Sequence, residues 1–323
     1  MNCITDVKDK ISKLIIKAYQ HESSDLFIRE NMYPYIRNNL GKIEMLENNF
    51  IKDSQMISFL EKVQQQLTID DLDNDLDFFI NIININCRCH FYKTFKGMAI
   101  AIRLLPDKIP SLDVLGLPES IKLLTDIKSG LIIVSGPTGS GKSTTIASII
   151  DAINQKYNYH IITIEDPIEY TFEDKKSIIS QILLGKNITS FAQGIKASMR
   201  ENPNVKVALF AAESGHLVIT TLHADNIIDA LDRVTNYEEK LKLKNLLTNT
   251  FQAIIAQKLI TTKEHKVLCL EILLRSKAAV SCIKNNDYTS LINIMKTTPG
   301  MMTMQDHFNT LKEQGIISKE IKL

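Results

Sequence analysis

One segment combines a glycine-rich loop with the lysine and hydroxyl groups that phosphate chemistry requires. Its residues are, in order, Gly136, Pro137, Thr138, Gly139, Ser140, Gly141, Lys142, Ser143 and Thr144. They satisfy the P-loop pattern in full, and the glycines let consecutive N–H groups turn inward around an anion. We expect Lys142 to place a charge at the β- and γ-phosphate oxygens, and Ser143 to bind Mg²⁺ through its hydroxyl. The loop therefore predicts a site for ATP and Mg²⁺.

Acidic side chains follow an apolar run downstream of this loop. Glu165, Asp166 and Glu169 come directly after residues 160–164. Ligands of open α/β sheets bind at the carboxyl ends of the strands, so Glu165 is a candidate catalytic residue that orders water or Mg²⁺ beside the γ-phosphate. Taken alone, an acidic strand end is more often a solvated turn.

Alternating strands and helices must position these groups. Apolar runs at residues 131–135, 160–165 and 217–222 have the length of buried strands, and residues 142–155 between the first two have helical spacing. This alternation predicts a parallel sheet with crossover helices. The P-loop then lies between a strand and a helix, where such loops occur.

The N-terminal part has a different pattern. Helical periodicity covers residues 7–20 and 53–66, and extended patterns cover residues 26–28 and 78–101. These elements predict a small α+β domain. Two prolines within residues 105–111 interrupt regular structure and indicate a linker.

Domain boundaries follow from this linker. A length of 323 residues fits two domains, because most domains have roughly 100 to 200 residues. We expect an N-terminal domain over residues 1–106, a linker over 107–112 and an ATPase domain over 113–323. The last part of that domain, about residues 236–323, has mainly helical spacing.

Composition limits the possible partners and compartment. The 38 basic and 37 acidic side chains give a net charge of +1, so no overall attraction to nucleic acid is expected. No run approaches the roughly 20 apolar residues that span a bilayer, and the N-terminus lacks a signal-peptide pattern. Cys87 and Cys89 have no second close pair to complete a zinc site, and alternate residues of a strand share one face. A reduced, cytoplasmic protein is predicted.

Four motifs together resemble those of the type IV pilus and type II secretion ATPases. They occupy residues 136–145, 162–170, 211–217 and 221–223. In the terms of that family they are similar to the Walker A loop, the aspartate box and the histidine box. Ser24-Asp25-Leu26 resembles the opening of the family's PAS-like domain, and Met304-Gln305-Asp306 resembles a C-terminal element of the PilT-like retraction subgroup. Extension and secretion ATPases usually carry a longer N-terminal region and a four-cysteine zinc module, which favours retraction.

The resemblance implies a fold and an assembly. The expected fold class is α/β, with a RecA-like P-loop ATPase core, an N-terminal PAS-like α+β domain and a helical C-terminal part. The expected assembly is a homo-hexamer at the cytoplasmic side of the inner membrane, held at the base of the pilus by a platform protein. Its work would be pilus retraction in twitching motility, with no direct contact to nucleic acid.

The resemblance also implies residues that act between subunits. Arg88 and Arg103 are the candidates that reach a neighbouring subunit's ATP, and Lys96 stands where family members tend to have arginine. His216 and His223 lie in the family's histidine-containing motifs and are candidates to sense the γ-phosphate or to relay nucleotide state. Solvated strand-edge charges and polar niches are the ordinary alternatives for these residues.

One family feature is missing. Between Arg200-Glu201-Asn202-Pro203 and Ala211-Ala212-Glu213 the family has a buried strand that ends in the Walker B glutamate, and this chain is shorter there. The loss would open a slot in the sheet, which residues 205–210 are apolar enough to fill as a strand. It also removes the acid that polarises the attacking water, leaving Glu165, or Glu213 as a substitute.

Three hypotheses remain open from the sequence. The chain is a retraction motor with reduced or absent hydrolysis, or a non-hydrolysing regulatory subunit that joins a ring with an intact paralogous ATPase. The third hypothesis is a decayed gene whose product folds poorly. Pilus extension or type II secretion is the alternative to retraction.

Overall fold

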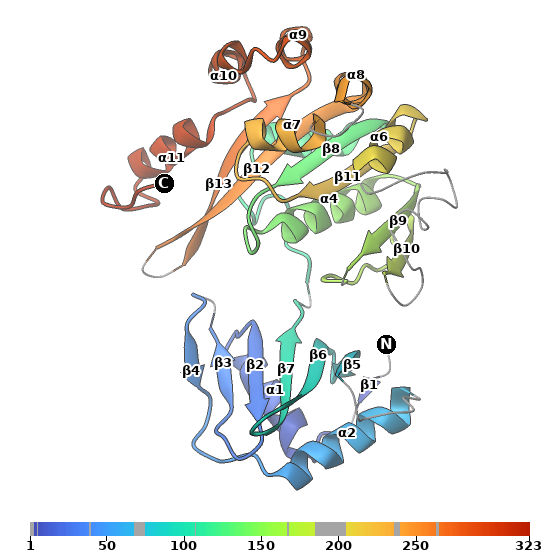
Figure 1. The fold of residues 1–323 in the computed structure, drawn as a ribbon, viewed down its shortest axis with the longest axis vertical. Coiled ribbons are helices and arrows are strands. Elements are labelled where there is room, and N and C mark those ends of the chain that lie inside the picture. Colours follow the sequence, from blue (N-terminus) through green and yellow to red (C-terminus); the bar gives the residue numbers. More distant parts are fainter. Residues whose placement is uncertain are drawn as a thin grey trace. The chain divides into compact units, whose positions relative to one another are not determined.

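The computed structural model describes the chain except for residues 1, 2, 5, 39, 68–74, 107, 167, 185–204, 236–239 and 263–264. The chain divides into two compact units, Met1–Lys108 and Ile109–Leu323 (Figure 1). The division falls within the predicted linker. In the described part of the chain, every helix is too short or too polar to traverse a bilayer.

The first unit is a sheet with two helices. Its strand order is β1-β5-β6-β7-β2-β3-β4. The strands are β1 (Cys3–Ile4), β2 (Asp25–Arg29), β3 (Tyr35–Arg37), β4 (Ile43–Met45), β5 (Leu76–Ile82), β6 (Ile85–Thr94) and β7 (Gly97–Leu104). The helices are α1 (Lys10–Gln20) and α2 (Asp53–Leu67). Both helices contribute side chains to one core with the sheet, which confirms the predicted α+β arrangement; its likeness to a PAS domain stays a prediction.

Local sequence explains why these elements form. The carboxylate of Asp9 accepts a hydrogen bond from the Ser12 N–H and so caps α1, whose apolar residues are buried at helical spacing. Burial alternates along β6, where Cys87 and Cys89 are both buried on the core side. The two side chains therefore lie on one face of the strand, as predicted for alternate residues.

The second unit is built on a four-stranded sheet of order β11-β8-β12-β13. The strands are β8 (Gly130–Ser135), β11 (Leu217–Leu222), β12 (Phe251–Thr261) and β13 (Lys266–Leu274). Both β11 and β12 run parallel to β8, and β13 runs antiparallel to β12. Every residue of β8 is buried, because helices cover both of its faces.

Helices of the second unit divide between those two faces (Figure 1). On one face, Ile132 and Val134 of β8 pack with α4 (Lys142–Lys156) and with α3 (Glu119–Lys122). On the other, Leu131 and Ile133 pack with a larger group of helices. That group is α6 (Val205–Glu213), α7 (Ile227–Thr235), α8 (Lys240–Thr250), α9 (Lys277–Asn285) and α10 (Tyr288–Thr297). The final helix, α11 (Met304–Glu313), packs on β13.

One prediction for this unit is incomplete and another is wrong. The segment after residue 236 contains α8, α9, α10 and α11, in keeping with the predicted helical part, but β12 and β13 also lie within it; Ile254 and Ile255 fit both a helical spacing and the continuous apolar run of a buried strand. Residues 205–210 do not fill the sheet as a strand, because they form α6. This helix buries Ala208, Leu209 and Ala212 on one face, and a continuous apolar run of this length does not by itself distinguish strand from helix.

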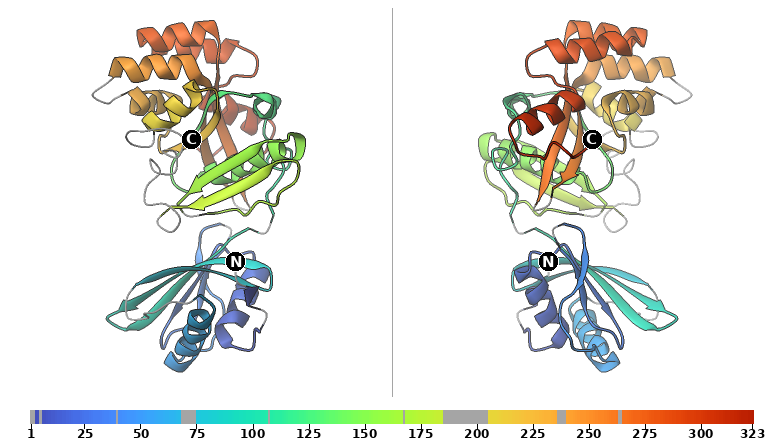
Figure 2. Two further views of the ribbon diagram at one scale, coloured as in Figure 1. Left: turned by 90° about the vertical axis from the view of Figure 1, so that its right-hand side faces the viewer. Right: turned by 90° about the vertical axis from the view of Figure 1, so that its left-hand side faces the viewer.

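A separate two-stranded sheet completes the unit. It pairs β9 (His160–Glu165) in parallel with β10 (Ile178–Leu183). Figure 2 shows this small sheet apart from the main one, on the side of α4. Asn154 of α4 anchors the connection to β10 through its side chain, donating to the Glu173 carbonyl and accepting from the Lys175 and Ser177 N–H groups. Among the described residues, β9 and β11 each have one free edge.

Candidate nucleotide-phosphate site

The glycine-rich loop connects the carboxyl end of β8 to α4. Gly136, Gly139 and Gly141 have φ values of 147°, 77° and 89°, which residues other than glycine rarely adopt. At Gly136 a Cβ would also lie 2.4 Å from the Gln257 carbonyl oxygen and 2.5 Å from Ser140 Oγ. The path of the backbone therefore requires glycine at position 136.

The N-terminus of α4 suits an anion. Gly141 is its N-cap and supplies no side-chain cap to the N–H groups of the first turn. Such uncapped donors at the positive end of a helix are a ready site for phosphate oxygens. Ser140 Oγ is also buried without a hydrogen-bond partner among the described residues. These features fit the predicted triphosphate.

Lys142 lies within the loop. Its Nζ donates to the carbonyls of Gly136 and Pro137, both at 2.9 Å. Burial lowers the pKa of its ammonium group, and the nearby charge of Glu169 opposes that shift. A partly desolvated cation gains more from a phosphate oxygen than an exposed one does, so this placement suits the predicted role of Lys142.

Ser143 is the residue that would hold Mg²⁺. It is the second residue of α4, directly after Lys142, and its hydroxyl is the kind of hard oxygen ligand that Mg²⁺ prefers. Among the described residues there is no cluster of three or more carboxylate, histidine or cysteine side chains that could hold a metal. A single serine hydroxyl fits an ion that takes most of its ligands from phosphate and water, as Mg²⁺ does.

Two supporting residues were not predicted. Gln257 of β12 is fully buried beneath the loop, where its Nε2 donates to Thr145 Oγ1 at 3.0 Å. Tyr170 is buried, and its hydroxyl lies 2.9 Å from Thr144 Oγ1. The signal for Gln257 was a lone amide in an apolar run, and it was missed because that run was assigned to a helix.

Glu165 ends β9, and its carboxylate already has partners. Oε1 accepts from Thr163 Oγ1 at 2.7 Å and from Gln181 Nε2 at 3.1 Å, while the Glu169 N–H lies 3.4 Å from Oε2. Gln181 also donates to the Tyr170 carbonyl at 2.8 Å, so the acidic segment is connected to the residue that contacts Thr144. The side chain is half-buried, which leaves it partly open to solvent.

The register of β11 against β8 separates two other predicted residues from the loop. Leu222 pairs with Ser135, so His223 follows at the edge where the loop begins. Leu217 pairs with Gly130 at the opposite edge, roughly 15–20 Å away at the rise of a strand. Glu213 and His216 precede Leu217 and lie at that opposite edge. This register places both residues away from the loop of their own chain, and the relay role of His216 stays a prediction.

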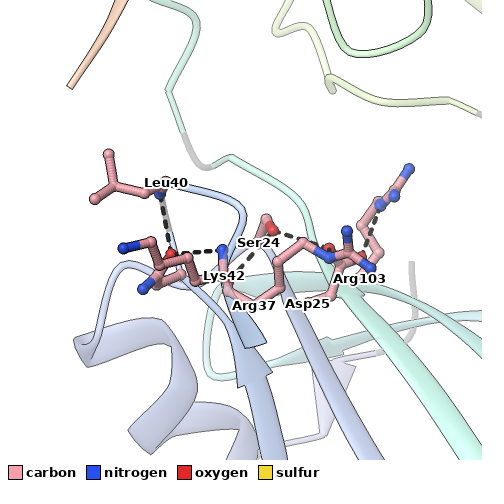
Figure 3. A network of polar contacts seen from close by, with 7 residues as sticks. Ser24, Asp25, Arg37, Leu40, Lys42 and Arg103 are labelled. Carbon is pink, nitrogen blue, oxygen red and sulfur yellow. Dashed lines mark hydrogen bonds and ion pairs between the residues drawn. The ribbon is translucent and has the colours of Figure 1, made fainter. Parts of the chain in front are cut away.

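The predicted arginines lie in the first unit. Arg88 of β6 is directly opposite Arg103 of β7, and Lys96 is exposed in the turn that connects these strands. Arg103 Nε donates to Asp25 Oδ1 at 3.1 Å (Figure 3). Arg88 Nη2 lies 3.7 Å from Asp77 Oδ1. Their role at a neighbouring subunit's nucleotide stays a prediction.

Comparisons with known proteins agree with this geometry. Residues 5–319 match the family model described as "Type II/IV secretion system protein". The chain is 33% identical over 304 residues to a twitching motility protein of Neisseria gonorrhoeae, covering 88% of this chain and 80% of that one. It is 29% identical over 331 residues to the type IV pilus retraction ATPase PilT of Pseudomonas aeruginosa, covering 96% of each.

A solved structure extends the likeness to the fold. The crystal structure titled as the pilus retraction motor PilT with bound ADP superposes with a TM-score of 0.83 at 35% identity, covering 96% of this chain and 95% of that one. The mixed α/β architecture is thus that of the RecA-like P-loop ATPases, as predicted. The chain belongs to the type II/IV secretion system protein family.

Proposed function

We propose that this protein is an ATP-binding subunit of a type IV pilus retraction motor. The observation that carries the proposal is the β8–loop–α4 connection, with its uncapped helix N-terminus and the buried Lys142. The likeness to retraction ATPases over nearly the whole chain supports the retraction class over extension or type II secretion. Mg²⁺ at Ser143 and assembly as a homo-hexamer belong to the same proposal.

Hydrolysis is proposed to be slow or absent. Glu165 is engaged by Thr163 and Gln181, and Glu213 is at the far edge of the sheet. Binding does not depend on a water-activating acid, whereas a general base typically contributes about 10² to 10⁴ in rate. The proposed site therefore retains ATP longer than a motor with its acid in place.

A regulatory subunit is the second candidate. A site that has phosphate-binding groups but no well-placed activating acid suits a subunit that binds ATP without hydrolysing it. Such a subunit would join a ring with an intact paralogous ATPase. In either case we propose a location at the cytoplasmic face of the inner membrane, through the pilus platform protein rather than through a lipid-spanning segment.

Calorimetry and steady-state turnover on the full chain test the proposal. Magnesium-ATP is expected to bind and to raise the melting temperature, because a ligand that binds only the native state adds about 2.7 kcal/mol at 100 times its Kd. Lys142→Ala is expected to lose most of that binding, with Lys156→Ala at the far end of α4 as the matched control. No ATP uptake by cooperatively folded wild-type protein would refute the proposal, and the lack of a cooperative transition would favour the decayed gene.

A further inference from the structure

Gln181 of β10 uses every polar atom of its side chain in a hydrogen bond. Its Nε2 donates to Glu165 Oε1 at 3.1 Å and to the Tyr170 carbonyl at 2.8 Å, and its Oε1 accepts from the Phe172 N–H at 2.9 Å. A primary amide combines two donor hydrogens with a carbonyl acceptor, so it can make all three contacts at once. Gln181 therefore fixes three points of the chain that runs on from the end of β9.

The pairing of β9 with β10 explains how Gln181 reaches these groups. Gln181 is directly opposite Thr163, and Glu165 lies two residues beyond Thr163 on the same strand. Opposed residues, and residues two apart on one strand, share a face of a sheet. These three side chains therefore lie on one face. Ser180 lies on the other face, where its Oγ is 3.0 Å from His160 Nε2.

The two carboxylate oxygens of Glu165 differ in their contacts. Oε1 accepts from Thr163 Oγ1 at 2.7 Å as well as from Gln181. Among the described residues, Oε2 has one long contact, at 3.4 Å from the Glu169 N–H. Two donors on Oε1 fix the orientation of the carboxylate, and Oε2 keeps the acceptor capacity that a water molecule needs.

Two further interactions place this segment beside the phosphate loop. Tyr170 is buried, and its hydroxyl lies 2.9 Å from Thr144 Oγ1 in the first turn of α4. Burial lowers the pKa of the Lys142 ammonium group and the charge of Glu169 opposes that shift, so the acidic segment lies within electrostatic reach of the lysine. By holding this segment, Gln181 fixes it relative to the residues that would bind ATP.

We propose that Gln181 is the positioning residue for Glu165 in a slow hydrolysis of ATP. Held through Oε1, Glu165 presents Oε2 to the attacking water. The water oxygen bonds to the γ-phosphorus as the bond from phosphorus to the β–γ bridging oxygen breaks; ADP keeps that electron pair, and one water proton passes through Oε2 to the released phosphate. This inference rests on the proposed function, and it favours slow hydrolysis over none because one oxygen of the acid stays available.

Phosphate release from magnesium-ATP by the full chain tests this role. Rates are measured over a range of ATP concentrations, and Lys142→Ala prepared in the same way gives the background from contaminating ATPases. Gln181→Met keeps the length of the side chain and removes its hydrogen bonds. It is expected to lower kcat at least about tenfold, the loss of one charge-assisted contact, while KM and ADP affinity stay close to the wild-type values.

Ser180→Ala is the matched control, because it removes a contact between the same two strands on the opposite face of the sheet. It is expected to keep the wild-type kcat. Tyr170→Phe removes only the hydroxyl contact with Thr144 and is expected to lower kcat in the same direction as Gln181→Met. If Gln181→Met shows no cooperative thermal transition, an unchanged kcat in Tyr170→Phe overturns the inference.

The inference is also overturned if folded Gln181→Met keeps the wild-type kcat, if Ser180→Ala lowers kcat equally, or if the loss appears in KM alone. Wild-type protein that binds ATP but releases no phosphate above the Lys142→Ala background overturns it too, and leaves the proposed ATP-binding subunit standing. Wild-type protein that binds no ATP at all contradicts the proposed function itself.

Discussion

At the residue scale, the phosphate loop depends on backbone positions that accept no side chain. Gly136 combines a φ of 147° with a near contact to Gln257, whereas Gly215 has a φ of 97° and open space around its Cα. Both glycines relieve backbone strain, but only Gly136 also avoids a collision with a neighbouring strand. Alanine substitutions at the two positions therefore separate the effect of an unfavourable backbone conformation from that of a steric clash with β12.

Gly136→Ala is expected to abolish measurable ATP binding and to lower the melting temperature, because a Cβ would displace either the loop or β12. Gly215→Ala carries the conformational cost alone, about 1–2 kcal/mol, and is expected to leave ATP affinity unchanged. Isothermal calorimetry and thermal denaturation measure both effects. Equal losses of ATP affinity in the two variants would mean that crowding at Gly136 is not what shapes the loop.

Glu165 and Glu213 offer a second comparison between single residues. Any turnover that the protein retains is expected to depend on Glu165, which ends β9, and not on Glu213, which lies beyond the opposite edge of the sheet. Glu165→Gln is expected to lower residual hydrolysis by about 10² or more with little change in ATP affinity, and Glu213→Gln to change neither. A steady-state phosphate-release assay decides between them, and a loss with Glu213→Gln alone would reverse the assignment.

At the element scale, the sequence was most informative where the signal is local. The segment from residue 130 to residue 156 contains an apolar strand, a glycine turn and a helix in immediate succession, and the structure has all three. The two N-terminal helices were likewise predicted from the spacing of their apolar residues. Strands β12 and β13 were missed because a continuously apolar run such as residues 253–256 fits a buried helix as well as a central strand. The identity of β12 is decided by its pairing with β8, which lies far away in sequence, and that of β13 by its pairing with β12.

Pairing between strands that are distant in sequence also limited which site residues could be predicted. The loop residues form one contiguous motif, so their grouping was predictable. That His223 lies beside the loop while His216 lies at the other edge follows only from the pairing of β11 with β8. The contact of Gln257 with Thr145 likewise joins elements that sequence spacing does not relate.

The first N–H groups of two helices, α7 and α11, donate to the same buried carboxylate, that of Glu271. Glu271 of β13 is 8% exposed, and its Oε2 accepts from the Ile227 N–H at 2.9 Å at the start of α7. Burial raises its pKa above the ordinary value of 4.5, with Asp229 adding to the shift, while hydrogen bonds from the Ile227 and Met304 N–H groups act against it. The carboxylate thus connects α7 and α11 to the sheet at a cost in desolvation.

This raised pKa predicts a pH dependence of stability. Above pH 4.5 the native state binds more protons at Glu271 than the unfolded state does, so its contribution to the free energy of unfolding falls as pH rises towards the raised value. Urea unfolding of Glu271→Gln is expected to lack that component, whereas the exposed Glu320→Gln keeps it. An identical pH profile for wild type and Glu271→Gln would contradict the assignment.

At the scale of the whole molecule, the chain separates two tasks between two units. The second unit carries the P-loop, and the first carries the two predicted arginines, Arg88 and Arg103. Such a division would suit the predicted action of these arginines on a neighbouring subunit's nucleotide. A subunit without an effective activating acid can still bind ATP and present arginines to a neighbour. It could therefore contribute to a ring even where it does not hydrolyse its own ATP.

Mixed assembly with an intact retraction ATPase therefore distinguishes motor from regulator. If the chain is a regulatory subunit, co-expression with a differently tagged intact paralogue is expected to yield co-purification that depends on magnesium-ATP, and Lys142→Ala in this chain is expected to reduce it. Turnover per intact subunit in the mixed ring should fall with Arg88→Gln and Arg103→Gln, because these arginines would act on the paralogue's nucleotide, but not with Lys42→Ala, a change at an exposed lysine of the same unit. Assembly of this chain only with itself, together with turnover at rates typical of motors, would contradict the regulatory role and the proposed loss of hydrolysis alike.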